Sequence, residues 1–265
     1  STTGSCSESN IQPLLVSCSI GQIGICHNGN LVNAADIRRK HEEHGHIFTT
    51  TSDTEVVLHM LAAREFVELP DSLAAVLRQL RGSYCLLLAY PDRIKAVRDP
   101  SGNRPLCLGR IDEAWVVASE TCALDIVDAE YVRDVEPGEI VTLTVNGIQS
   151  RRFVEPESVR RAHCIFEHVY FADPSSLVFG ENVHMARKEM GAALAREAPA
   201  EADIVIPVPN CARCAAMGFH EESGIPMGRG FTTNHYVGRS FIQPTQTIRD
   251  LTVRMKLNPI RASVE

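Results

Sequence analysis

The run His27-Asn28-Gly29-Asn30 carries the residues whose types and spacing best suit chemistry, and it closes a hydrophobic stretch. An Asn side chain offers two N–H donors, and a Gly lets the main chain approach a substrate closely. Two adjacent donors of this kind are typical of an oxyanion hole, which holds the negative oxygen formed during acyl transfer. Asn28 and Gly29 are therefore predicted to polarise a carbonyl group. The alternative is an Asn-Gly turn in which His27 is only packed.

Acyl transfer also needs a nucleophile and a base, and the nearby sequence contains no Ser-His-Asp or Cys-His arrangement that would supply them. A second polar run, Thr51-Ser52-Asp53-Thr54-Glu55, precedes an apolar segment with helical spacing. In this run, Ser52 or Asp53 is predicted to be the N-cap of a helix.

Composition limits the classes of partner. The chain has 265 residues, 44% of them hydrophobic, and a net charge of −7. The negative charge argues against nucleic-acid binding, and no apolar run approaches the roughly 18 residues of a membrane span. Nine cysteines, mostly inside apolar runs, indicate reduced thiols. We expect a cytoplasmic protein with small-molecule or protein partners, and, since the sequence opens with Ser1, a fragment.

The first part of the chain is predicted to place helices on a layered sheet. Helical spacing covers residues 31–44, a segment after Asp53 and a segment from Asp71 to near Gly82. Strands are expected within 11–27 and at 84–90, 114–118 and 139–145, separated by turn signals such as Asn146-Gly147. Short consecutive strands joined by tight turns favour antiparallel pairing.

The second part of the chain has a different pattern of polar and apolar residues. Residues 149–164 are polar and are interpreted as an interdomain connection. A helix at about 181–197 and a strand at 202–209 follow, an alternation typical of the start of a parallel α/β sheet. The sequence stops before such a sheet would be complete, which we interpret as a second sign of truncation.

Further motifs follow the runs around Asn28 and Asp53. They are Arg98-Asp99-Pro100, Arg104-Pro105-Leu106, Ala118–Asp125, Pro137–Val141, Cys164–Glu167, Val169–Ala172, Tyr236–Pro244 and Lys256–Pro259. Together, all these motifs resemble the amidophosphoribosyltransferase family over essentially all 265 residues. The runs around Asn28 and Asp53 are shared with other class II glutamine amidotransferases, whereas the further motifs are specific to the family.

This resemblance implies an α+β protein with two domains. Residues 1–150 would form a partial αββα domain like that of N-terminal-nucleophile hydrolases, and residues 165–265 the start of an α/β phosphoribosyltransferase domain. The implied reaction takes ammonia from glutamine to displace pyrophosphate from phosphoribosyl pyrophosphate (PRPP), giving 5-phosphoribosylamine for purine synthesis. Purine nucleotides would be regulators, and the full-length protein a homo-oligomer.

Roles for individual residues also follow from the resemblance. Asn28 and Gly29 match the oxyanion hole, and Asp53 matches the carboxylate that holds the glutamine α-amino group. Thr2 would approach the glutamine carboxylate. Tyr236 and Arg239 lie in the segment that resembles the lid over PRPP.

The chain departs from the family pattern in the groups that carry the reaction. The N-terminal Cys nucleophile and the Asp-Asp phosphate loop are missing, so we expect no glutaminase activity and no productive PRPP binding from this fragment. Mg²⁺ is implied by the family, but Asn210-Cys211 replaces Asp-Ser, and a thiol is a poor magnesium ligand. Cys164 coincides with an iron–sulfur ligand of some members, so a cluster is conceivable only in the full-length protein and no cofactor is expected for the fragment.

Two alternatives remain open from the sequence. A non-catalytic relative would use the pocket at Asn28 and Asp53 to bind glutamine or a nucleotide. A thiol oxidoreductase would work through Cys211 and Cys214, whose spacing is that of a redox pair.

Overall fold

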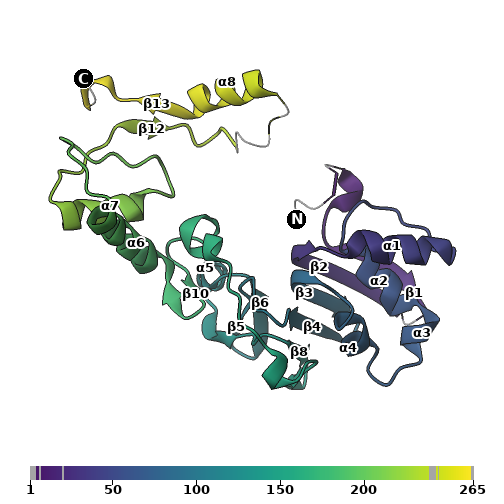
Figure 1. Ribbon diagram of the computed structural model, residues 1–265. Coiled ribbons are helices and arrows are strands. Elements are labelled where there is room, and N and C mark those ends of the chain that lie inside the picture. Colours follow the sequence, from purple (N-terminus) through teal and green to yellow (C-terminus); the bar gives the residue numbers. More distant parts are fainter. Residues whose placement is uncertain (1–3, 6, 20, 239–242, 244, 264–265) are drawn as a thin grey trace. The chain divides into compact units, whose positions relative to one another are not determined.

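The computed structural model describes residues 4–5, 7–19, 21–238, 243 and 245–263. The chain divides into two compact units, residues 1–165 and 166–265, which are treated separately below (Figure 1). Both helices and strands contribute to each unit, so the predicted α+β class is confirmed. Within the described residues, no helix combines the length and hydrophobicity that a membrane span requires.

A six-stranded antiparallel sheet organises residues 1–165, with strand order β1-β2-β3-β4-β8-β9. Its strands are β1 (Leu14–Cys18), β2 (Gly21–Leu31), β3 (Gly82–Tyr90), β4 (Arg93–Arg98), β8 (Glu139–Thr144) and β9 (Gly147–Arg152). The antiparallel pairing expected from the short connections is confirmed. The predicted strands at 84–90 and 139–145 correspond to β3 and β8.

Helices cover one face of this sheet and a second sheet covers the other (Figure 1). The helices are α1 (Ala34–Glu43), α2 (Glu55–Ala62), α3 (Arg64–Val67) and α4 (Ser72–Leu77); the second sheet has the order β6-β5-β7, from β6 (Ala114–Ala118), β5 (Cys107–Ile111) and β7 (Glu130–Asp134). Helix α5 (Thr121–Ile126) packs on the outer side of the second sheet through Leu124. The layers therefore run helices, sheet, sheet, helix.

Alternation along the strands builds this layering. On β3, Tyr84, Leu86 and Leu88 are buried in the core shared with the helices, while Cys85 and Leu87 belong to the core between the two sheets. Successive side chains of a strand point to opposite faces, so a strand buried on both sides reads as a continuous apolar run.

Two interpretations of this unit are wrong. Residues 149–152 are not part of a connection, because they complete β9, an edge strand whose residues from Gln149 to Arg152 are exposed. Neither Ser52 nor Asp53 is the helix N-cap, because Thr54 occupies that position and α2 has no side-chain cap. The Asp53 carboxylate instead accepts a hydrogen bond from the distant Leu31 N–H (2.8 Å). The predicted helix after Asp71 is confirmed as α4, with Asp71 capping Ala74 N–H.

Residues 166–265 contain less regular structure. A π-helical turn (Glu167–Phe171) and the hairpin β10 (Leu177–Val178) and β11 (Glu181–Asn182) lead into α6 (Val183–Glu197), which confirms the helix predicted at 181–197. Next come α7 (Arg213–Ser223), β12 (Phe231–Thr233), α8 (Gln246–Lys256) and β13 (Leu257–Pro259), and β12 pairs with β13. Short 3-10 helices occur at Glu8–Asn10, Pro156–Ser158 and Arg261–Ser263.

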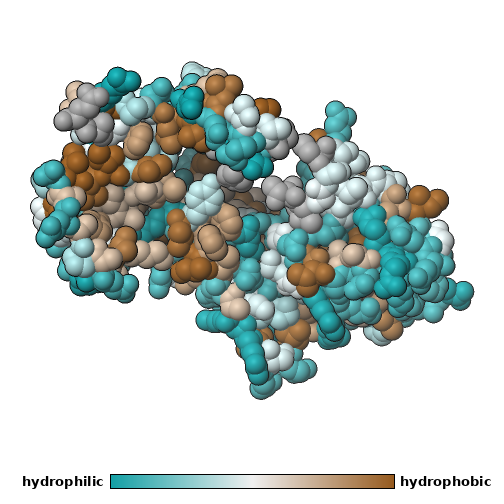
Figure 2. All heavy atoms as spheres, turned by 45° about the horizontal axis from the view of Figure 1, so that its top comes forward, coloured by the Kyte–Doolittle hydropathy of each residue, from teal (hydrophilic) through white to brown (hydrophobic). Residues whose placement is uncertain are grey.

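The prediction of a strand at 202–209 is wrong. Only one parallel bridge forms there, between Val205 and Met227. Pro207 and Pro209 lack the N–H donors that a longer ladder would need. Exposed hydrophobic side chains are frequent in this unit, and Leu251 and Met255 of α8 are two examples. Figure 2 shows brown patches on its left side.

Candidate active site

Asn28 lies in the layer between the two sheets, on the wall of a cavity of about 450 Å³. It stands opposite Cys85 in the pairing of β2 with β3, so both side chains share the face directed at the second sheet. The residues that line the cavity are Cys26, His27, Asn28, Cys85, Leu87, Leu106, Val117, Ala118, Ser119, Glu120, Cys122 and Ala123.

Two polar side chains fix the orientation of the Asn28 amide. Arg104 donates to its Oδ1 (3.2 Å), and its Nδ2 donates to Ser119 Oγ (3.2 Å). Among the described residues, Ser119 accepts from one of the two N–H donors of this amide. Since Asn28 lines the cavity, its second N–H is the donor that a bound carbonyl oxygen could meet.

Gly29 is required by the close approach of its neighbours. It has φ +152°, and a Cβ there would come within 3.0 Å of the Ser83 carbonyl oxygen and 2.8 Å from His27 Nε2. Because Asn28 and Gly29 lie inside the paired strand β2, the alternative of an Asn-Gly turn is wrong.

His27 and Asp53 lie on the helix-covered side of β2. His27 Nδ1 is 3.1 Å from Thr54 Oγ1 and 3.5 Å from Asp53 Oδ1. Burial alone would raise the pKa of Asp53, but hydrogen bonds from His27 and from the Leu31 N–H outweigh it and lower this pKa. The Asp53 side chain is only 3% exposed, and it is not among the residues that line the Asn28 cavity.

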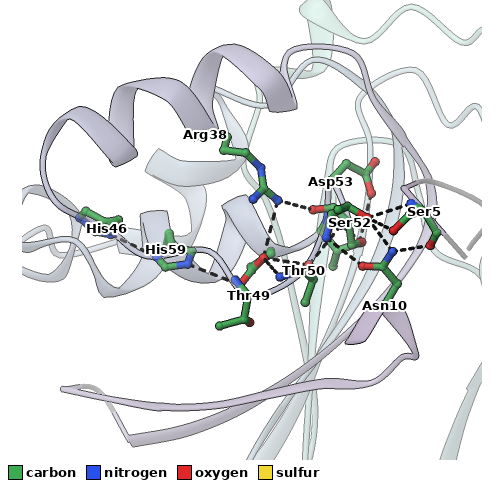
Figure 3. A network of polar contacts seen from close by, with 12 residues as sticks. Ser5, Asn10, Arg38, His46, Thr49, Thr50, Ser52, Asp53 and His59 are labelled. Atoms are coloured by element: carbon green, nitrogen blue, oxygen red, sulfur yellow. Dashed lines mark hydrogen bonds and ion pairs between the residues drawn. The ribbon is translucent and has the colours of Figure 1, made fainter. Parts of the chain in front are cut away.

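The segment before α2 is held by a network of polar contacts (Figure 3). Glu55 accepts hydrogen bonds from the N–H and hydroxyl groups of both Thr49 and Thr50, at 2.8–2.9 Å. Arg38 donates to the Ser52 carbonyl oxygen (3.1 Å). These bonds fix the main chain on each side of Asp53 and so determine where its carboxylate meets β2.

A buried arginine positions Arg104, a role that the sequence did not reveal. Arg98, 2% exposed, donates to the carbonyl oxygens of Arg104 (2.9 Å), Val135 (2.7 Å) and Gly102 (3.1 Å). The neighbouring Asp99 is fully buried and accepts from Ser101 N–H (2.8 Å). A buried charge with several partners orders the loop that carries Arg104.

Three thiols share the cavity with Asn28, and their local contacts do not favour a nucleophilic thiolate. Burial raises the pKa of Cys26. Cys85 donates weakly to the carbonyl oxygens of Arg104 and Pro105 (3.5 Å), and Cys122 Sγ lies 3.8 Å from a Glu120 carboxylate oxygen. A nearby carboxylate opposes a second negative charge.

The other predicted site residues are dispersed. Thr2 and Arg239 lie outside the described residues. Tyr236 is fully exposed, and its N–H donates to Asn234 Oδ1 (3.1 Å). Cys164 is half-buried near the end of the first unit, and its N–H donates to the Asn103 carbonyl oxygen (3.0 Å).

Cys211 does not suit the Mg²⁺ that the resemblance implies. Cys211 is exposed and offers a soft thiol where Mg²⁺ would need a hard oxygen donor. Across the described part of the chain, no group of three or more His, Cys, Asp or Glu side chains is arranged to hold a metal ion, and Cys164 belongs to no such group.

Comparisons with known proteins agree with these features. A family described as "Glutamine amidotransferase domain" matches residues 3–125. The amidophosphoribosyltransferase of Methanothermobacter thermautotrophicus is 46% identical over 268 residues, covering 100% of this chain and 56% of that protein. Amidophosphoribosyltransferase 3, chloroplastic, of Arabidopsis thaliana is 44% identical, covering 100% of this chain and 50% of that protein.

A solved structure is also similar. It is the glutamine PRPP amidotransferase from B. subtilis complexed with ADP and GMP, with a TM-score of 0.88 and 44% identity over 98% of this chain and 57% of that one. The chain thus spans about half the length of the relatives it matches. Because the identity extends through both units, this chain belongs to the amidophosphoribosyltransferase family.

Proposed function

We propose that the protein is a glutamine-dependent amidophosphoribosyltransferase of purine synthesis. Glutamine would supply ammonia, and the ammonia would displace pyrophosphate from PRPP to give 5-phosphoribosylamine. Identity of 44–46% to proteins of this name over the whole chain supports the proposal. A cytoplasmic location remains a prediction.

The two halves of the reaction would be divided between the units. Residues 1–150 would form the glutamine amidotransferase domain, although β9 continues to Arg152. Residues 165–265 would begin the phosphoribosyltransferase domain. The parallel bridge between Val205 and Met227, with α6 before it and α7 inserted between its two halves, supports an α/β arrangement.

The oriented amide of Asn28 carries the proposal for the glutamine half. In acyl transfer, negative charge develops on the carbonyl oxygen, and fixed donors stabilise it without reorganising during the reaction. Arg104 and Ser119 fix the Asn28 amide in advance, and Gly29 would add its main-chain N–H. Asn28 and Gly29 would therefore form the oxyanion hole for the glutamine amide.

Asp53 would hold the glutamine α-amino group only after a rearrangement. Its carboxylate is bonded to Leu31 N–H and faces His27, and only 3% of its side chain is exposed. A bound ammonium would have to replace one of these partners. Thr2 near the glutamine carboxylate, and Tyr236 and Arg239 in a lid over PRPP, complete the proposed binding groups.

The full gene product tests the whole proposal. Release of pyrophosphate from PRPP is measured with glutamine and, separately, with ammonium chloride as nitrogen source. Asn28→Ala is expected to lower kcat with glutamine by about 10²–10³, the usual cost of one oxyanion donor, and to leave the ammonia reaction unchanged. Asn146→Ala, in the β8–β9 turn, is the matched control. Equal losses with both nitrogen sources would contradict the role of Asn28.

A non-catalytic relative is the competing interpretation, and it predicts binding without turnover. Calorimetry with glutamine, next to an ammonia assay on the full gene product, separates the two. Glutamine binding without ammonia release would favour the non-catalytic relative.

Purine nucleotides are proposed as regulators because the similar B. subtilis structure was complexed with ADP and GMP. A homo-oligomer is expected for the full-length protein.

A further inference from the structure

We propose that Cys211 and Cys214 form a reversible intramolecular disulfide, with His184 accepting the proton of Cys214. The three residues lie within residues 166–265 and take no part in the proposed glutamine site. This inference does not depend on the proposed function, because it rests on the two thiols and the imidazole alone.

The two thiols differ in accessibility. Cys211 is exposed in the turn that leads into α7, whereas Cys214 is 7% exposed and is the second residue of that helix. The two residues between the cysteines are helical, because Ala212 has helical backbone angles and Arg213 is the first residue of α7. Cys211 and Cys214 are therefore the first and fourth residues of a turn, whose Cα atoms lie within about 7 Å, which is also the upper limit for a disulfide.

His184 is fixed against the buried thiol. Its Nδ1 lies 3.2 Å from Cys214 Sγ, across the contact between α6 and α7. These helices pack closely because Gly191 meets Ala215 and Gly218 meets Lys188, where a Cβ would collide with main-chain atoms. The contact persists in both protonation states: the thiol donates to the imidazole, or the protonated imidazole donates to the thiolate.

A low-molecular-weight disulfide is the required oxidant. The Cys211 thiolate attacks one sulfur of that disulfide, whose S–S bond breaks, and one small thiolate leaves. Cys214 passes its proton to His184 Nδ1, and its sulfur attacks the Cys211 sulfur. The second small thiolate leaves and takes up a proton. Two protein thiols are oxidised and one small disulfide is reduced.

Oxidised glutathione is the probe, and peptide mass mapping of the whole chain is the measurement. In the unmodified protein, the peptide containing both cysteines is expected to lose two hydrogens. Cys214→Ser is expected to retain glutathione on Cys211, because the resolving thiol is gone. Cys211→Ser is expected to leave Cys214 unmodified on the same timescale. A stable glutathione adduct on Cys211 of the unmodified protein would overturn the proposal.

His184→Gln tests the proton acceptor. At about pH 7, closure of the disulfide from the Cys211 adduct is expected to slow by about tenfold or more, and at about pH 9 most of the difference should vanish because hydroxide replaces the imidazole. His220→Gln is the matched control, since His220 lies on α7 but bonds to the Ile225 carbonyl oxygen. Equal closure rates in His184→Gln and the unmodified protein at about pH 7 would refute the role of His184. Circular dichroism checks that α7 is intact, and the cysteine variants test the disulfide independently.

Discussion

Gly29→Ala tests whether the predicted oxyanion residue is fixed by close packing of β2 against β3. A Cβ at this position would lie within 3.0 Å of the Ser83 carbonyl oxygen, a main-chain atom that cannot rotate away. The backbone φ of +152° adds strain, because side chains rarely adopt it. The substitution should therefore destabilise the first unit strongly.

Three contributions give the magnitude. Strain at such a φ costs about 1–3 kcal/mol, and the lower entropy of the unfolded alanine chain returns about 0.4–1 kcal/mol. Forcing an extra methyl group into a packed site costs about 1–3 kcal/mol, and the upper end applies when the neighbour is main chain. The expected net loss in the free energy of unfolding is about 3–4 kcal/mol.

Gly21→Ala is the matched control on the same strand. Gly21 has φ +102°, but a Cβ there would meet nothing within 4 Å, so only the strain and entropy contributions remain. That variant should lose about 1 kcal/mol. The difference between the two variants, about 2–3 kcal/mol, measures the contact with Ser83.

Urea unfolding followed by fluorescence provides the assay. The chain has a single Trp, Trp115 on β6, so its emission reports the first unit. With an m-value of about 2 kcal/mol/M, Gly29→Ala should lower the urea midpoint by about 1.5–2 M and Gly21→Ala by about 0.5 M. Equal shifts in the two variants would refute the argument from close approach.

Three further outcomes follow from the charges and thiols around the site. Burial alone would raise the pKa of Glu55, but hydrogen bonds from Thr49 and Thr50 lower this pKa below 4.5. The ionised Glu55 therefore stabilises the fold above pH 4.5, and this stabilisation is lost as the pH falls through the lowered pKa. In urea titrations between about pH 3 and 6, Glu55→Gln should show a smaller loss of unfolding free energy toward low pH. Burial lowers the pKa of His41 below 6.5, and the nearby His46 lowers it further. The unfolded chain therefore binds a proton at this residue first, and the stability of the fold should decrease as the pH drops below 6.5. In thermal melts, the melting temperature of His41→Asn should decrease less over the same pH range. Since burial raises the pKa of Cys26, its thiol should not be the nucleophile, and Cys26→Ser in the full gene product should leave ammonia release from glutamine unchanged in a coupled assay; loss of that release would show that a cavity thiol is the nucleophile.

A strand that is buried on both faces was predictable from the sequence, whereas an exposed edge strand was not, for a physical reason. The apolar run of β3 is buried on both faces, so composition alone marks it. Strand β9 lies at the sheet edge, and from Gln149 to Arg152 it is exposed, so its sequence is as polar as a connection. The segment at 202–209 shows the reverse case: its β-branched residues predict a strand, but two prolines and a single bridging partner do not sustain one.

The candidate site was predictable in its residue types but not in its geometry. Asp53 has the sequence context of an N-cap, and no local pattern shows that its carboxylate instead accepts the Leu31 N–H, 22 positions away. Arg104 stands in a motif that indicates the family, yet its contact with Asn28 spans 76 positions. Long-range partners of this kind depend on the pairing of β2 with β3 and on the packing of the two sheets.

Strand alternation explains why neighbouring residues of one motif act on different faces. His27 turns toward the helices and meets Asp53, while Asn28 turns toward the second sheet and meets Arg104. On the helix side, the Asp53 carboxylate accepts from the Leu31 N–H at the end of β2, and on the other side Arg104 donates to the oxygen of the Asn28 amide. A change at Asp53 should therefore act first on the stability of the strand, whereas a change at Arg104 should act first on the orientation of the amide and hence on turnover of glutamine. The two effects can be separated because β2 itself lies between them.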